Sequence, residues 1–269
     1  MPRLPSPDTL LPKPKELYSR LVDEVRFLKD QAGMKENNKN SLERSYHRLS
    51  NQEPTDWTLN IQPNWIIKIE APDERTQRDR SRDFSNDDGW AVIGGYISVR
   101  DNEYTNYSIN LTILAGRDSE YRGQGIGDPC CWDGEGAEDA WRVAKQYHFD
   151  IDVGDNDDES KPITHFQSRG KFDPDRLPNA IWESVHYCST PLDKPRLPFP
   201  PMDPVLLVQI IKDQYGCPEQ LHSEYWGSEV LDSESMLWGS YYSGIAQHMD
   251  DDNRSDPFDS LLSNGRMNS

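Results

Sequence analysis

The amino-acid sequence predicts an α+β fold, with N-terminal helices, a central and mostly antiparallel sheet, and C-terminal helices on one face of that sheet. Apolar residues recur at helical spacing near the N-terminus and again after residue 203. Between these segments the spacing changes to the period of two that a half-buried strand shows. The link between two of the predicted strands, residues 100–106, is short and polar, which favours antiparallel neighbours.

The N-terminal helices follow an arm, residues 1–14, that is rich in proline and expected to be extended. Four apolar residues at helical spacing predict the first helix: Leu17, Leu21, Val25 and Leu28. It should end near Gln31, because Gly33 follows. Charged residues expected on its surface are Glu16, Arg20, Glu24 and Lys29. A weaker stripe made by Leu42, Tyr46 and Leu49 predicts a second helix.

Five segments are predicted to be strands: 57–69, 90–99, 107–114, 141–153 and 162–168. Pro63 interrupts the first of them, so we expect an irregular or edge strand there. The last two should form a hairpin in which Phe149 faces Phe166 on one side, while Asp150 faces His165 and His148 faces Gln167 on the other. A slip of one residue would put Phe166 opposite Asp150, so the hydrophobic pattern favours this register.

The best-marked helix begins after Asp203, which is the predicted N-cap. Pro204 occupies the first helical position, and Gly216 should end the helix. Residues 218–248 should form one or two further helices, rich in aromatic residues such as Trp226 and Trp238. We therefore expect a single domain over residues 15–248, followed by a disordered acidic tail, residues 249–269.

Charge is the strongest compositional signal, since 47 acidic residues against 29 basic residues give a formal net charge of −18. Few lysines beside many aspartates indicate a halophilic organism, in which an acidic surface is an adaptation to high salt. This acidity does not exclude nucleic acid, because high salt screens the phosphate charge, but no feature of the sequence supports such binding. No apolar run approaches the roughly 20 residues that span a bilayer, so we expect a cytoplasmic protein without membrane contact.

Polar residues of the predicted hairpin form the candidate site. The register brings His148, Asp150 and His165 to one face, with Asp152 further along the same strand. Two imidazoles and one or two carboxylates suit a divalent metal ion that activates water for hydrolysis. Alternatively, Asp150 orients His165 as a general base. The competing interpretation is that these residues form the solvent-exposed face of the hairpin, where a carboxylate opposite a histidine is an ordinary cross-strand pair.

Three sequence segments also carry a resemblance: HFDID (148–152), KPITH (161–165) and PRLPFPPMDP (195–204), the last leading into an apolar helix. Over residues 141–215 the chain resembles uncharacterised prokaryotic proteins similar to domains of unknown function from mobile-element and anti-phage defence neighbourhoods. The resemblance implies no established activity. Lys161 stands where that pattern often has a histidine, which removes one metal ligand and weighs against an enzyme.

Two functions therefore stay open. The first is an accessory or interaction protein that works beside a protein partner in a mobile-element or defence-type system. The second is a metal-dependent hydrolase, acting on a phosphodiester in the manner of a nuclease, with His148, Asp150, Asp152 and His165 as its site. The first needs no cofactor, whereas the second requires a divalent metal ion.

Overall fold

The computed structural model describes residues 7–32, 34–69, 89–116, 141–151, 153, 164–168, 185–186, 196–215 and 223–252. The N-terminal helices are α1 (Pro7–Leu10), α2 (Pro14–Asp30) and α3 (Lys35–Ser50). The strands are β1 (Trp57–Lys68), β2 (Gly89–Arg100), β3 (Glu103–Gly116), β4 (Trp141–Ile151), β5 (Thr164–Ser168), β6 (Val185–His186) and β7 (Arg196–Pro198). Two C-terminal helices follow, α6 (Pro204–Tyr215) and α7 (Trp226–Asp252).

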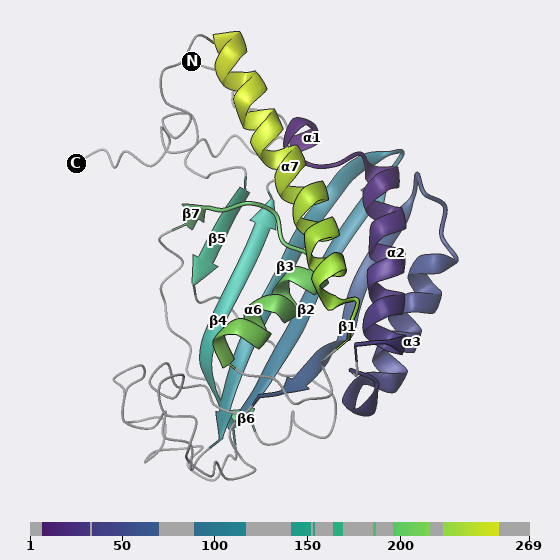
Figure 1. Cartoon of the computed structure of the whole chain (residues 1–269), viewed down its shortest axis with the longest axis vertical. Helices are drawn as coiled ribbons and strands as arrows, with labels where there is room; N and C mark the ends of the chain where they lie inside the picture. Colours follow the sequence, from purple (N-terminus) through teal and green to yellow (C-terminus); the bar gives the residue numbers. More distant parts are fainter. Residues whose placement is uncertain are drawn as a thin grey trace, which may run out of the picture.

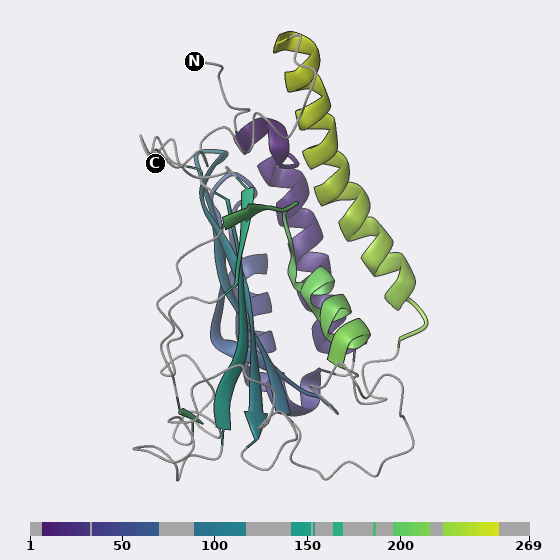
Figure 2. The ribbon, with the colours of Figure 1, turned by 90° about the vertical axis from the view of Figure 1, so that its left-hand side faces the viewer.

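The fold is α+β, as predicted. The strands lie in the order β1-β2-β3-β4-β5-β7 with antiparallel neighbours, and the short β6 pairs in parallel with β4. Helices α2, α6 and α7 lie on one face of this sheet (Figures 1 and 2). The register between β1 and β2 shifts between Ile61 and Trp65, where Pro63 interrupts the strand, which confirms the predicted irregularity.

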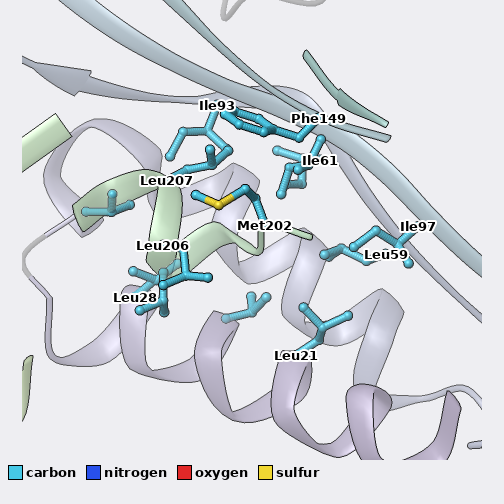
Figure 3. Close-up of a cluster of buried hydrophobic side chains, with 14 of the residues drawn as sticks. Leu21, Leu28, Leu59, Ile61, Ile93, Ile97, Phe149, Met202, Leu206 and Leu207 are labelled. Carbon is cyan, nitrogen blue, oxygen red and sulfur yellow. The ribbon is translucent and has the colours of Figure 1, made fainter. Parts of the chain in front are cut away.

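The hydrophobic core lies between the sheet and these helices (Figure 3). Alternate residues of the strands point into it, and they meet apolar side chains of α2 and α6 together with Met202. The residues labelled in Figure 3 are Leu21, Leu28, Leu59, Ile61, Ile93, Ile97, Phe149, Met202, Leu206 and Leu207. At the start of α6 the Leu206 backbone N–H donates to Asp203 Oδ1 at 2.8 Å, so the predicted N-cap is confirmed.

Helix α3 protects the edge of the sheet at β1. The Asn38 amide donates to the Ile66 carbonyl at 2.6 Å and accepts from the Ile66 N–H at 2.7 Å. Just beyond α3, the Gln52 amide makes the same pair of bonds to the Thr58 backbone, at 2.9 and 2.7 Å. Each amide therefore satisfies one N–H and one C=O that an edge strand would otherwise offer to another chain.

Polar residues form a buried cluster where α2, α6 and α7 meet, contrary to the expectation that Arg20 and Glu24 lie on the surface of α2. The Glu24 side chain is 0% exposed and that of Arg20 is 9% exposed. Arg20 Nε donates to Glu24 Oε1 at 2.9 Å, and another of its nitrogens donates to Ser233 Oγ of α7 at 2.9 Å. Arg20 also contacts the Glu229 carboxylate at 2.7 Å. Because α7 lies against this side of α2, the charged residues are enclosed.

Glu24 and Asp203 are two buried carboxyl groups of this cluster. Neither Glu24 Oε2 nor Asp203 Oδ2 has a hydrogen-bond partner, and both atoms are buried. Burial raises the pKa of Glu24 well above its ordinary value, and the charge of Asp203 raises it further. Burial likewise raises the pKa of Asp203. A proton held by Glu24 would let Glu24 donate to the Asp203 carboxylate and so satisfy both oxygens.

Both ends of the described chain differ from expectation. Residues 7–10 form α1, and its last residue Leu10 and the following Leu11 are buried, although we expected an extended arm there. These two leucines supply the apolar anchors that make the arm part of the core. At the other end, α7 is one continuous helix and reaches Asp252, so it includes the first residues of the predicted tail. The remainder of that tail, residues 253–269, lies outside the described residues.

Candidate functional site

Strands β4 and β5 form the predicted hairpin in the predicted register. Phe149 pairs with Phe166, Asp150 with His165, and His148 with Gln167. The aromatic pair faces the helices, so the alternation of the strands puts Asp150 and His165 on the opposite face of the sheet. His148 lies on that same face, two residues from Asp150.

Asp150 contacts two neighbours from adjacent strands. The Ser108 hydroxyl of β3 donates to Asp150 Oδ1 at 2.5 Å, and His165 Nε2 lies 3.7 Å from Asp150 Oδ2. The second distance is too long for a hydrogen bond, so the histidine and the carboxylate interact electrostatically. The order of the three groups is serine, carboxylate, imidazole. A serine nucleophile needs the imidazole beside its hydroxyl, so this order does not activate Ser108.

His148 is the most chemically unusual residue of the site. Its Nε2 atom is buried and has no hydrogen-bond partner. Burial lowers the pKa of His148, while the nearby charge of Asp150 opposes this shift. The imidazole is therefore neutral at neutral pH and presents a ring nitrogen that is not used within the fold.

The structure brings together three of the four predicted site residues: His148, Asp150 and His165. Within the described part of the chain, no group of three or more His, Cys, Asp and Glu side chains is placed to hold a metal ion. The fourth predicted ligand, Asp152, lies outside the described residues, and so does Lys161. The metal-binding role of these residues thus remains a prediction.

The polar face of the hairpin is more buried than a solvent-exposed strand pair would be. His165 is 6% exposed, and Gln146 and Thr112 on the same face are buried as well. The competing interpretation from the sequence assumed a solvent-exposed face; of its cross-strand pair, Asp150 is 29% exposed and His165 is buried. β4 is an interior strand along this part of the sheet, so residues of both β3 and β5 flank His148 and Asp150.

Sequence reasoning missed polar residues that neighbouring strands add to this face. Asn110 pairs with His148 in the register of β3 and β4, next to the pair of Ser108 with Asp150. On β2, a Cβ atom at Gly94 would lie 2.8 Å from Asn110 Oδ1 and 2.9 Å from Asn64 Oδ1. The missing side chain of Gly94 therefore lets two amides approach each other across β2. The sequence of β3 could have indicated these residues, because Ser108 and Asn110 alternate with apolar residues, as the residues on the polar face of a strand do.

The outer side of α7 is a second candidate site. Leu231 and Tyr242 are 62% and 58% exposed, and the exposed Ser235, Gly239 and Ala246 lie on the same side of the helix. We call these five residues the α7 surface. No Asp, Glu, Lys or Arg occurs from residue 235 to 248, although 28% of the whole chain is charged. In Figures 1 and 2 the C-terminal half of α7 extends beyond the end of the sheet.

The inner side of α7 is occupied by contacts within the fold. The Trp226 indole N–H donates to Gln209 Oε1 of α6 at 2.5 Å, and the ring lies 5.5 Å from that of Phe27. The Trp238 indole donates to the Pro201 carbonyl at 3.0 Å. Both tryptophans therefore make structural contacts within the fold. The exposed residues of the α7 surface are the better candidates.

None of the described helices is both long enough and apolar enough to cross a membrane. Comparison with protein-family models, curated proteins and solved structures found no match to this chain. The function has therefore to be inferred from the chain's own residues.

Proposed function

We propose that this protein is an accessory, non-enzymatic protein that binds a protein partner through the α7 surface. The observation that carries this proposal is the pair of large exposed side chains on one side of α7, Leu231 and Tyr242: Tyr242 lies in the segment 235–248, which has no charged residue, and Leu231 lies just before that segment, next to Asp232. Exposed tyrosine and leucine beside small residues allow close approach of another chain, and apolar surface without charge costs little to desolvate.

The partner that fits the α7 surface is another protein with an apolar helix or groove. The inner side of α7 already contacts the rest of the fold, for example Ser233 with Arg20 and Glu24. At low salt concentration, a second copy of the chain would bring two molecules of net charge −18 together, and this repulsion disfavours self-association. The resemblance over residues 141–215 directs the search for the partner to mobile-element or defence-type systems of a halophilic prokaryote.

Tyr242→Ser should weaken partner binding without unfolding the protein, because the side chain is exposed. We expect tagged wild-type protein to co-purify a specific partner from the native host, and the affinity of the purified pair to fall at least about tenfold in the variant. Tyr96→Ser is the matched control. Tyr96 is also an exposed tyrosine, but it lies on β2, where it pairs with Ser108 of β3 on the sheet face that points away from the helices. Calorimetric titration of each variant with the isolated partner measures the difference.

Equal affinities of Tyr242→Ser and wild type would contradict the proposed surface. The proposed surface would also be contradicted if light scattering gave the mass of a dimer of this chain bound through α7 and of no other complex. If Tyr96→Ser weakened binding and Tyr242→Ser did not, the partner would bind the polar face of the sheet instead.

The second candidate function is a metal-dependent hydrolase at His148, Asp150, Asp152 and His165. It is favoured by the buried, partnerless Nε2 of His148 close to the Asp150–His165 pair. In this case a divalent metal ion would supply the activated water, and the His148 imidazole would be one of its ligands.

Asp150→Asn separates the two functions. The amide keeps an acceptor for the Ser108 hydroxyl, so we expect a loss in stability of less than about 1 kcal/mol. Under our proposal the variant retains full affinity for the partner and the same metal content as wild type. If instead metal bound to wild-type protein disappeared in Asp150→Asn and His165→Ala at unchanged melting temperature, the hydrolase would be the correct function.

A further inference from the structure

Helix α3 lies farthest out among the described elements at the β1 edge of the sheet (Figure 1). Two of its sides are occupied within the fold. Tyr46 faces α2, where Lys29 Nζ lies 5.4 Å from the centre of its ring, and Asn38 bonds to the backbone of Ile66 in β1. The third side of α3 points away from both α2 and β1.

Exposed polar residues form a stripe along this third side. Spacings of four, three and four residues place Asn40, Arg44, His47 and Asn51 on one side of the helix, and Arg48 lies one turn after Arg44. We call these five residues the α3 stripe; its last member directly follows the end of the helix. All five are exposed and none is acidic, in a chain whose formal net charge is −18.

The two arginines of the α3 stripe differ from the exposed arginine of α2. On α2, the guanidinium of Arg26 lies 2.5 Å from the carboxylate of Asp23, so its charge is balanced locally. Within the part of the chain that the structure describes, neither Arg44 nor Arg48 contacts a carboxylate. Their positive charges and their N–H donors are therefore available to an anion.

Acidic residues lie beside the α3 stripe without interrupting it. Glu43 is half-buried, and Lys39, four residues earlier on the same side of the helix, offsets its charge. The exposed Glu53 and Asp56 follow the C-terminal end of the stripe. Residues 39–51 contain three Lys or Arg and one Glu, so their formal charge is +2. The stripe is a local positive region, and at 0.1 M salt the field of more distant acidic residues is screened within about 10 Å.

The shape and residue types of the α3 stripe fit duplex DNA. An α-helix with its side chains is about 10–12 Å across, and the major groove of B-form DNA is about 12 Å wide. Arginine binds phosphates and guanine, and an asparagine amide matches the donor and acceptor of adenine. An acidic protein surface accounts for the arginines, but it offers no such donor–acceptor pattern to the two amides.

We propose that the α3 stripe binds in the major groove of duplex DNA. Arg48 contacts a phosphate, while Asn40, Arg44 and Asn51 face the base edges. The eleven-residue rise from Asn40 to Asn51 is about 16 Å, or roughly five base pairs. This surface is on a different helix from the α7 surface, and the inference does not depend on the proposed partner protein.

The test is fluorescence anisotropy of a labelled DNA duplex of about 16 base pairs, titrated with the full-length protein between about 0.1 and 0.4 M KCl. We expect saturable binding with a Kd below about 100 µM at the lowest salt concentration, the range of non-specific DNA binding. Duplex RNA of the same sequence should bind at least about fivefold more weakly, because side chains cannot enter the narrow major groove of A-form RNA.

Arg48→Gln should weaken DNA binding about fivefold or more, and the plot of log K against log [KCl] should become less steep by about 1, because one phosphate contact is lost. Arg26→Gln is the matched control. It also removes one exposed arginine, so the net charge of the chain and its repulsion of DNA change equally, but Arg26 is on α2 and paired with Asp23. This control should keep the wild-type slope.

Four results would overturn the proposal: no saturable DNA binding by wild type, equal affinity for duplex RNA, equal slopes for wild type and Arg48→Gln, or equal effects of the two arginine substitutions. An oligoglutamate peptide that displaced the DNA as well as unlabelled duplex of equal charge would also overturn it. In that case the α3 stripe would be a surface for an acidic protein.

Discussion

Arg20→Met is expected to lower the free energy of unfolding by about 3 kcal/mol, the range found when one partner of a buried ion pair is removed. Arg20 is 9% exposed and joins Glu24 of its own helix to Glu229 and Ser233 of α7. Methionine fills much of the same volume but removes the charged donor that these groups share. Since the interaction connects α2 to α7, the loss should affect global unfolding, and denaturant titration measures it.

Arg26→Met is the control for this prediction. Arg26 is on the same helix and also pairs with a carboxylate, Asp23, but the two side chains are 56% and 55% exposed. Exposed pairs of this kind contribute less than about 1 kcal/mol. Equal destabilisation by the two arginine substitutions would show that the buried cluster does not connect the helices energetically.

Glu24→Gln is expected to change how stability depends on pH. The pKa of Glu24 in the folded protein is raised above its ordinary value of 4.5, so the folded state keeps a proton that the unfolded state releases. The stabilisation from this proton is complete below the unfolded pKa and is lost as the pH rises towards the folded pKa. In that window wild-type stability should fall by up to about 1.4 kcal/mol per pH unit relative to the variant.

Glutamine should preserve the geometry of the pair, because its amide N–H₂ can donate to Asp203 Oδ2 while its oxygen still accepts from Arg20 and Ser233. Melting temperatures of the two proteins at a series of pH values measure the difference. His148, whose lowered pKa gives a dependence of the opposite sign, is present in both proteins and cancels. Asp23→Asn controls for the loss of one carboxylate on the exposed side of α2. Parallel profiles of wild type and Glu24→Gln would contradict a proton held by Glu24.

The candidate site could be predicted only as far as one hairpin extends. Asp150 and His165 come from strands that are close in sequence, and the alternation of aromatic and polar residues determines their register. Ser108 and Asn110 could not be assigned to the same site, because β3 and β4 are separated by residues 117–140. A connection of that length leaves the register of the two strands undetermined by local pattern.

Apart from the short elements α1, β6 and β7, the helices and strands could be predicted from the sequence, since their periods of 3.6 and 2 depend only on residues close together in the chain. The N-cap at Asp203 could be predicted for the same reason, because it also depends only on residues close together in the chain. The tertiary structure decided which polar residues are buried. Glu24 and Arg20 lie on the polar side of α2 by periodicity, and they become interior only because α7, about two hundred residues later, packs against that side. Burial depends on which distant element covers a surface, and no local pattern contains that information.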